Sequence, residues 1–224
     1  AQVRQLVQDG ALGEVAGVAV QHLIFKGLAY WAGGYGGRTP DNWRACRAKA
    51  GGGILIMGLV HSLDYMEHIL GQRITRVYAE HSVVEVPGDV EDNISLSCRF
   101  ARGAVGNWCA STGYQGTAVT TERLWGTEGT MTLKPEPAEL FLKRRHGALA
   151  PGKPLPLPAP RETNFRAAWV DQFARAVQSN CTPQVSWRDG WHITALCEAA
   201  YVSQSEGRAV PVVEPPTHLV AGTP

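Results

Sequence analysis

The chain has 224 residues, of which 44% are hydrophobic and 18% are charged, and this length and composition fit one large soluble domain or two small ones. The net charge is +1, from 21 basic and 20 acidic side chains, and the absence of a basic tail or face argues against nucleic acid as a partner. No stretch reaches the roughly 18 to 20 apolar residues that cross a bilayer, so we expect no membrane partner.

The cysteines indicate the redox environment. There are five of them, an odd number, widely spaced and without a C-x-x-C pair. This pattern is typical of a reduced cytoplasmic protein and unlike a disulfide framework or a zinc site. We therefore expect a cytoplasmic protein with no metal site. The cysteines are Cys46, Cys98, Cys109, Cys181 and Cys197.

The first residues predict a helix followed by a strand. Val3, Leu6 and Val7 recur at helical spacing with no capping residue ahead of them, so we expect residue 1 to lie within a helix and not at its start. Residues 1–12 are expected to be the end of a linking helix, and Gly13 opens the domain proper. The valine-rich run at 15–24 predicts a strand.

Residues 25–49 are expected to be an irregular loop. Aromatic and arginine side chains stand among glycines there, and loops on a rigid scaffold often carry binding contacts. An ordinary surface connection fits the same residues equally well. The glycines at 33–37 lack the preceding strand and following helix of a dinucleotide fingerprint. The candidates for hydrogen bonding or stacking on a polyhydroxylated ligand are Lys26, Tyr35, Arg38, Trp43 and Arg44.

The central stretch, residues 50–70, predicts a helix behind three glycines. Its apolar residues recur every three or four positions, so they share one face. His61 and Asp64 lie three residues apart, so the carboxylate is placed to orient the imidazole. The alternative is a buried core helix in which His61 is a satisfied core residue. The shared face comprises Leu55, Leu59, Ser62, Leu63, Met66, Ile69 and Leu70.

The rest of the chain predicts a meander of strands and then two helices. Tight turns join the strand-like runs, which favours antiparallel neighbours. Ser186 and Asp189 have the spacing of a capping box, and residues 215–224 are expected to be a loose tail. We predict an α+β fold with an open, predominantly antiparallel sheet and helices packed on one face. Strands are predicted at 74–86, 93–100, 104–112, 117–125, 130–133, 138–144 and 210–213, and helices at 162–180 and 186–206.

Several motifs together resemble one family. The glycines at 51–53 followed by His61 and Asp64, the Gly126-Thr127-Glu128-Gly129 turn, and the pattern of the last two helices are similar to the C-terminal domain of glucose–fructose oxidoreductases and inositol dehydrogenases (Gfo/Idh/MocA). Met57 stands where this family has an aspartate. The resemblance covers nearly the whole of this chain and only the second half of a typical member.

The resemblance implies the substrate-binding and oligomerisation domain, residues 13–214, of an oxidoreductase acting on a sugar, polyol or similar CH–OH compound. It implies NAD or NADP bound by a Rossmann domain absent from this chain, and a homo-oligomer formed through the sheet face. His61 is then the acid/base candidate, Asp64 its orienter, and Met57 a substrate contact. Two alternatives remain: a non-redox binding or scaffold module, and a metal-dependent hydrolase or lyase using His61, Asp64 and His68.

Overall fold

The computed structural model describes residues 2–33, 41–157 and 164–215. Within this part of the chain, nine strands form one open sheet in the order β8-β7-β6-β5-β1-β4-β3-β2-β9. The central pair, β1 and β4, is parallel, and the other neighbours are antiparallel. The predicted α+β class and predominantly antiparallel sheet are confirmed.

The strands follow the turn signals of the sequence. They are β1 (Val15–Leu23), β2 (Ile74–Ser82), β3 (Asn93–Phe100), β4 (Val105–Ser111), β5 (Val119–Gly126), β6 (Gly129–Lys134), β7 (Glu139–Leu142), β8 (Leu155–Pro156) and β9 (Val210–Pro211). Alternation along β3 buries every second side chain, because only one face of the sheet carries helices.

The helical elements lie before, between and after the strands. They are α1 (Gln2–Gln8), α2 (Leu28–Gly33), the 3₁₀ turn η1 (Trp43–Ala45), α3 (Arg47–Ala50), the π-helical turn η2 (Leu55–Leu59), α4 (Val60–Leu70), α5 (Phe165–Gln178) and α6 (Trp187–Glu206). The expected loop at 25–49 thus contains helical turns. The proline-rich stretch after residue 147 contributes the short strand β8. This strand was not predicted, because proline is rare within strands.

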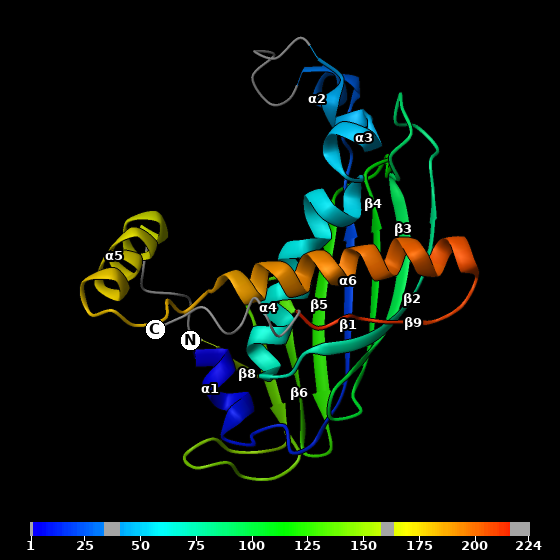
Figure 1. Cartoon of the computed structure of the whole chain (residues 1–224). Helices are drawn as coiled ribbons and strands as arrows, with labels where there is room; N and C mark the ends of the chain where they lie inside the picture. Colours follow the sequence, from blue (N-terminus) through cyan, green and yellow to red (C-terminus); the bar gives the residue numbers. More distant parts are fainter. Residues whose placement is uncertain (1, 34–40, 158–163, 216–224) are drawn as a thin grey trace.

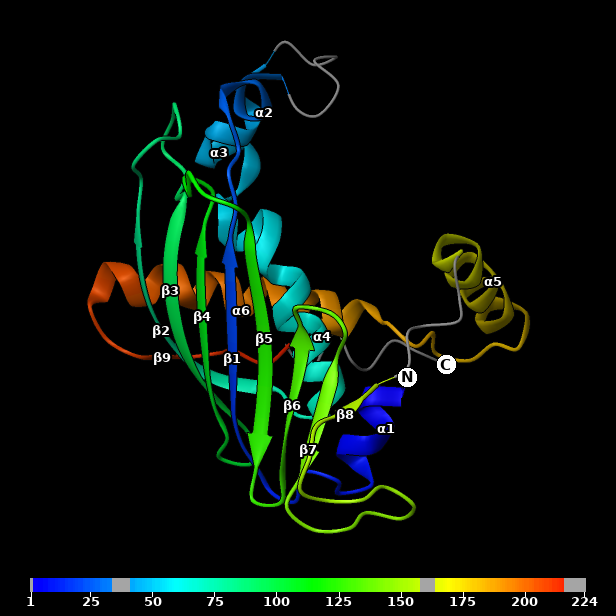
Figure 2. The same ribbon diagram turned by 180° about the vertical axis from the view of Figure 1, so that it is seen from behind.

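The helices α4 and α6 cover one face of the sheet, and α6 runs across the strands (Figure 1). None of the described helices lies on the opposite face (Figure 2). The core lies between the sheet and α4, where Leu63, Met66 and Trp108 are fully buried. Burial of the apolar residues from Leu55 to Leu70 confirms the helical face predicted from their spacing.

The three glycines before η2 have separate structural reasons. Gly51 adopts a left-handed conformation with φ of 82°, which favours glycine. A Cβ on Gly52 would lie 1.8 Å from the Tyr201 hydroxyl oxygen, and one on Gly53 would lie 1.8 Å from the backbone oxygen of Glu91. The buried Glu91 carboxylate accepts hydrogen bonds from the Gly53 and Leu55 amides at 2.9 Å each. The helical segment is thereby anchored to the loop before β3.

The helix α5 stands away from the sheet in both views (Figures 1 and 2). Asn164 caps its start by accepting a hydrogen bond from the Ala167 amide at 3.1 Å. The apolar stripe that predicted this helix faces outward, so Phe165, Trp169 and Val177 are more than half exposed. Residues 216–224 of the predicted tail lie outside the described part of the chain.

Candidate functional site

A cleft of about 390 Å³ opens between the helical segment η2–α4 and the ends of β1 and β5; we call it the His61 cleft. The His61 side chain lines it from the first turn of α4 and is exposed to solvent. This position differs from that of a satisfied core histidine, which would be enclosed by packed side chains. An imidazole in a cleft can exchange a proton with a bound hydroxyl group.

The floor of the His61 cleft is a ladder of paired side chains on β1 and β5. Val18 pairs with Leu124 deep in the core. One step along, Val20 pairs with Glu122, and one further step pairs His22 with Thr120. Since alternate residues share a face, this face changes from apolar to polar where the strands reach the cleft.

His22 is held by its cross-strand neighbour. Its Nδ1 lies 3.3 Å from Thr120 Oγ1. Burial lowers the pKa of the His22 imidazole, and this outweighs the attraction of Glu122. The ring is therefore neutral at pH 7 and able to donate one hydrogen bond and accept another.

The π-helical turn η2 brings Met57 and Gly58 to the same cleft. The π geometry widens the helix and changes which residues face outward, a feature that is frequent at functional sites. The Tyr30 hydroxyl lies 3.9 Å from Met57 Sδ, and Lys26 Nζ lies 5.0 Å from the centroid of the Tyr30 ring. Of the predicted ligand contacts, Lys26 and Met57 thus share the cleft with His61.

The other predicted ligand contacts lie next to the cleft or outside the described residues. Arg44 stacks on Trp43, with its guanidinium carbon 4.3 Å from that ring centroid and 5.3 Å from the Tyr30 centroid. Through Tyr30, this stacked pair adjoins the cleft without lining it. Tyr35 and Arg38 lie outside the described part of the chain.

Asp64 faces a second cleft, of about 510 Å³, on the other side of α4; we call it the Arg73 cleft. No hydrogen bond joins Asp64 to His61 among the described residues, although they are three positions apart on the helix. Burial raises the pKa of the Asp64 carboxyl, and the nearby carboxylates of Asp189 and Glu67 raise it further. The proposed orienting role of Asp64 remains a prediction.

Besides Tyr30, whose hydroxyl faces Met57, five polar residues of the His61 cleft were not singled out from the sequence. A usable signal was present in β5, where alternation places Glu122 on the face of the buried Leu124, an unusual position for a carboxylate. Tyr65 follows His61 by one helical turn, so it projects to the same side. Thr112 follows the last residue of β4 and carries no such signal. These residues are His22, Tyr65, Thr112, Thr120 and Glu122.

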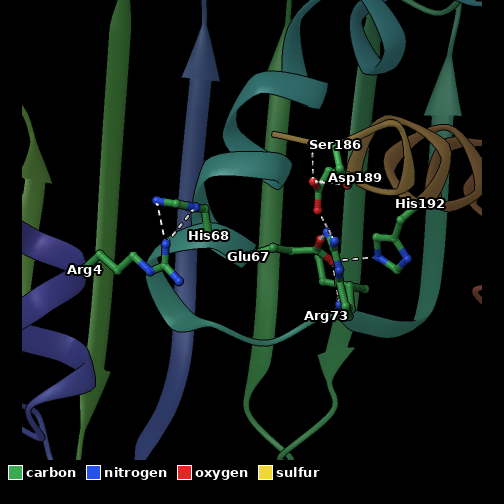
Figure 3. A network of polar contacts seen from close by, with 8 residues as sticks. Arg4, Glu67, His68, Arg73, Ser186, Asp189 and His192 are labelled. Atoms are coloured by element: carbon green, nitrogen blue, oxygen red, sulfur yellow. Dashed lines mark hydrogen bonds and ion pairs between the residues drawn. The ribbon is translucent and has the colours of Figure 1, made fainter. Parts of the chain in front are cut away.

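On the far side of α4, a network of hydrogen bonds surrounds Glu67 (Figure 3). The Glu67 carboxylate accepts hydrogen bonds from the Ile74 amide at 2.6 Å, His192 Nε2 at 2.8 Å and Arg73 Nη1 at 2.9 Å. Arg73 also pairs with Asp189, the capping-box residue at the start of α6. These contacts join α4, β2 and α6, so we assign this network a role in stabilising the fold.

His68 points away from this network toward α1 (Figure 3), where Arg4 Nη1 lies 3.3 Å from its Nε2. Burial lowers the pKa of His68, and Arg4 lowers it further. Within the described ranges, no group of three histidine, cysteine or acidic side chains is placed to hold a metal ion. The structure thus does not assemble His61, Asp64 and His68 as the metal site of a hydrolase or lyase. None of the described helices is long and apolar enough to cross a membrane.

Comparison with known proteins gives one family match and many structural neighbours. A family model described as the GFO/IDH/MocA C-terminal domain matches residues 1–132. No curated protein matches the sequence. Similar solved structures include an oxidoreductase domain protein from Kribbella flavida, with 21% identity and a TM-score of 0.78 over 95% of this chain and 62% of that one.

Two further neighbours were solved with bound small molecules. The aldose–aldose oxidoreductase from Caulobacter crescentus, complexed with glycerol, has 27% identity and a TM-score of 0.74 over 93% of this chain and 59% of that one. A levoglucosan dehydrogenase in complex with NADH has 20% identity and a TM-score of 0.76 over 95% of this chain and 62% of that one. The present chain therefore spans about three fifths of the length of these neighbours.

Proposed function

Because the chain belongs to the GFO/IDH/MocA family through its C-terminal domain, we propose that it is the substrate-binding part of an oxidoreductase acting on a sugar, polyol or similar CH–OH compound. The observation that carries this proposal is the exposed His61 imidazole in a cleft lined by polar strand ends. Neighbours described as complexes with glycerol and with NADH support it.

In this proposal the chemistry that a bound NAD or NADP would supply is hydride exchange with the substrate carbon. The cofactor is held by a nucleotide-binding domain, since no glycine-rich strand–turn–helix motif occurs in this sequence. When the alcohol is oxidised, His61 accepts the hydroxyl proton, and in the reverse direction it returns that proton. Lys26, together with the adjoining Trp43 and Arg44, contributes contacts to the substrate, and Tyr35 and Arg38 remain candidates. Asp64 is proposed to act on His61 only through the helix that carries both.

The outward apolar face of α5 supports the presence of a covering domain. Phe165, Trp169 and Phe173 are each more than half exposed, and the last two rings stack with centroids 6.4 Å apart. Contiguous exposed apolar side chains on a helix mark an interaction surface. Trp169 also lines the Arg73 cleft with Arg4, so a domain covering α5 would also adjoin α1 and α4.

The helix-free face of the sheet is the proposed site of homo-oligomerisation. Tyr78, Val105 and Trp125 are exposed there and line a shallow depression over β2, β3, β4 and β5. A second copy of the chain would cover this face in a symmetric pair. A solution mass of one chain at micromolar concentration would contradict this part of the proposal.

The test of His61 is its replacement by alanine in the intact protein, including its nucleotide-binding domain. Turnover of the preferred CH–OH substrate is expected to fall by at least ~100-fold, in line with the loss of a general acid/base. The melting temperature stays unchanged because the side chain is exposed. His68→Ala is the matched control. His68 lies two turns after His61 on the same helix, but its side chain lines the Arg73 cleft. Wild-type rates in the His61 variant would remove that residue from the site.

A non-redox binding module is the second candidate, and Met57 favours it. A thioether is only a weak acceptor, so Met57 cannot supply the proton-relay chemistry of the aspartate for which it stands. Titration of NADH, NADPH and simple sugars into the intact protein separates the two candidates. Binding of sugars without either nicotinamide cofactor would favour the module.

A further inference from the structure

The inner end of the His61 cleft contains polar groups that the protein itself does not satisfy. Thr112 is 4% exposed and Glu122 is 9% exposed. The Thr112 Oγ1 and Tyr65 Oη atoms are buried and form no hydrogen bond of standard geometry in the described part of the chain, and the Tyr65 phenol lies close enough to the Glu122 carboxylate for the two groups to interact. Among the described residues, Glu122 forms no ion pair. All three side chains line the cleft.

Two other buried carboxylates of the domain, those of Glu67 and Glu91, differ from Glu122 in the number of hydrogen bonds that they accept. Glu67 accepts three hydrogen bonds, and Glu91 also accepts three, from two backbone amides and the Tyr201 hydroxyl. Buried polar groups in folded proteins are nearly always paired, and an exception calls for an explanation. A binding site is one such explanation, because a ligand then completes the missing hydrogen bonds.

We propose that Glu122, with Tyr65 and Thr112, determines ligand specificity at the inner end of the His61 cleft, where it accepts hydrogen bonds from hydroxyl groups of an uncharged polyol and excludes ligands that bring a carboxylate there. This inference rests on the proposed function, in which the other end of the same ligand meets His61. It adds the substrate class, neutral polyhydroxylated compounds in preference to sugar acids.

The chemistry of the three groups supports this assignment. An ionised carboxylate only accepts hydrogen bonds, whereas a hydroxyl group both donates and accepts. A ligand hydroxyl can therefore donate to Glu122 while accepting from Tyr65 or Thr112. Burial and the neighbouring Glu122 carboxylate raise the pKa of the Tyr65 phenol, so Tyr65 retains its proton and donates it. A ligand carboxylate has no donor for Glu122 and meets a like charge in a partly enclosed site.

Among the described residues that line the cleft, Lys26, on the segment that follows β1, is the one lysine or arginine. A sugar acid bound through Lys26 would place its carboxylate at that residue and leave Glu122 without a role. Lys26 and Glu122 thus make opposite predictions for an anionic ligand, and affinity measurements discriminate between them.

The test compares two matched pairs of probes, glycerol with glycerate and glucose with glucuronate. Within each pair, the second compound carries a carboxylate where the first carries a CH₂OH group. Their affinities are measured by NMR titration of the full chain at neutral pH. The wild type is expected to bind the uncharged member of at least one pair tenfold or more tightly than the anionic member. Glu122→Gln, which keeps the shape of the side chain, is expected to reduce that ratio to threefold or less, mainly by improving binding of the anion.

Glu139→Gln is the control, because it removes the same charge from an exposed position on β7 of the same sheet. Its ratio is expected to equal that of the wild type. A ratio unchanged by Glu122→Gln, or a wild type that prefers the anion, overturns the assignment of Glu122 and leaves the proposed function in place. If no probe shifts resonances of the cleft residues, the inference and the proposed function both fail.

Discussion

Two buried carboxylates on opposite sides of α4 have opposite environments. Glu67 is enclosed by an arginine, a histidine and a backbone amide. Glu122 instead faces a cleft near two hydroxyl groups that form no hydrogen bond of standard geometry in the described part of the chain. Both oxygens of the Glu67 carboxylate are paired within the protein (Figure 3), although His192 Nδ1 has no partner among the described residues. In the proposal, a ligand supplies the hydrogen bonds of Glu122. The pairing of a buried charge, more than its burial, therefore separates a structural residue from a candidate binding residue in this domain.

The largest expected effect is on the Glu67 side. Glu67→Ala removes the acceptor for Arg73 and His192 and leaves the Ile74 amide unpaired, so we expect a loss of about 3–5 kcal/mol of folding free energy, as for breaking one member of a buried ion pair. Urea unfolding monitored by circular dichroism measures this loss. Glu67→Gln keeps the size and one acceptor and is expected to lose less. A loss below ~1 kcal/mol in the alanine variant would show that the network does not join α4 to α6.

A smaller effect is expected from Ser62, the residue after His61. Its hydroxyl donates to the Leu59 carbonyl at 3.0 Å and accepts from Trp108 Nε1 at 3.0 Å. Ser62→Ala leaves the buried indole N–H unpaired, which is worth about 1–3 kcal/mol. The same unfolding assay tests this expectation. Ser62→Cys retains a weak acceptor and should recover part of the loss.

The smallest effects concern pH and the two aspartates of the Arg73 cleft. Burial favours a higher pKa for Asp189, but hydrogen bonds from the Ser186 amide and from Arg73 outweigh it and hold the pKa below the ordinary value of 3.8. Its stabilising contribution is therefore complete above pH 3.8 and is lost as the pH falls through the lowered value. Asp189→Asn should lower stability at pH 7 by at most ~1 kcal/mol, because the pair is partly exposed.

Asp64 is expected to behave in the opposite way. Its pKa is raised, so ionisation opposes folding, and the native state loses stability as the pH rises above 3.8 through the raised value. Asp64→Asn should therefore be as stable as the wild type or more stable at pH 7. Melting temperatures of both variants between pH 3 and pH 7 give the two profiles. Parallel profiles for the two variants would contradict the assigned electrostatics.

Much of the fold could be predicted because its signals are local. Runs of β-prone residues bounded by turn residues identified most strands, helical spacing identified the buried face from Leu55 to Leu70, and Ser186 with Asp189 marked the start of α6. The α2 and α3 turns were missed because short helical turns among glycines have no periodicity. The π-helical turn η2 was also missed, since its sequence fits an ordinary helix equally well.

The candidate site could be predicted only in part because it is assembled from distant segments. The sequence identified His61 and Met57 from one helix, and both lie in the cleft. Asp64 was linked to His61 by spacing alone. The two side chains project about 60° apart around the helix, which places them on either side of the boundary between the two clefts. Glu122 lies on β5 and Thr112 directly follows β4, both more than 50 residues downstream of His61. Their proximity to His61 follows from the sheet order, which no local pattern contains.

The most direct test of the account is the position of a bound polyol in a crystal of the full chain soaked with myo-inositol or glycerol. The account predicts the ligand in the His61 cleft, with one hydroxyl group within hydrogen-bonding distance of the His61 imidazole and another at Glu122. A ligand bound in the Arg73 cleft, or one that contacts neither His61 nor Glu122, would contradict it.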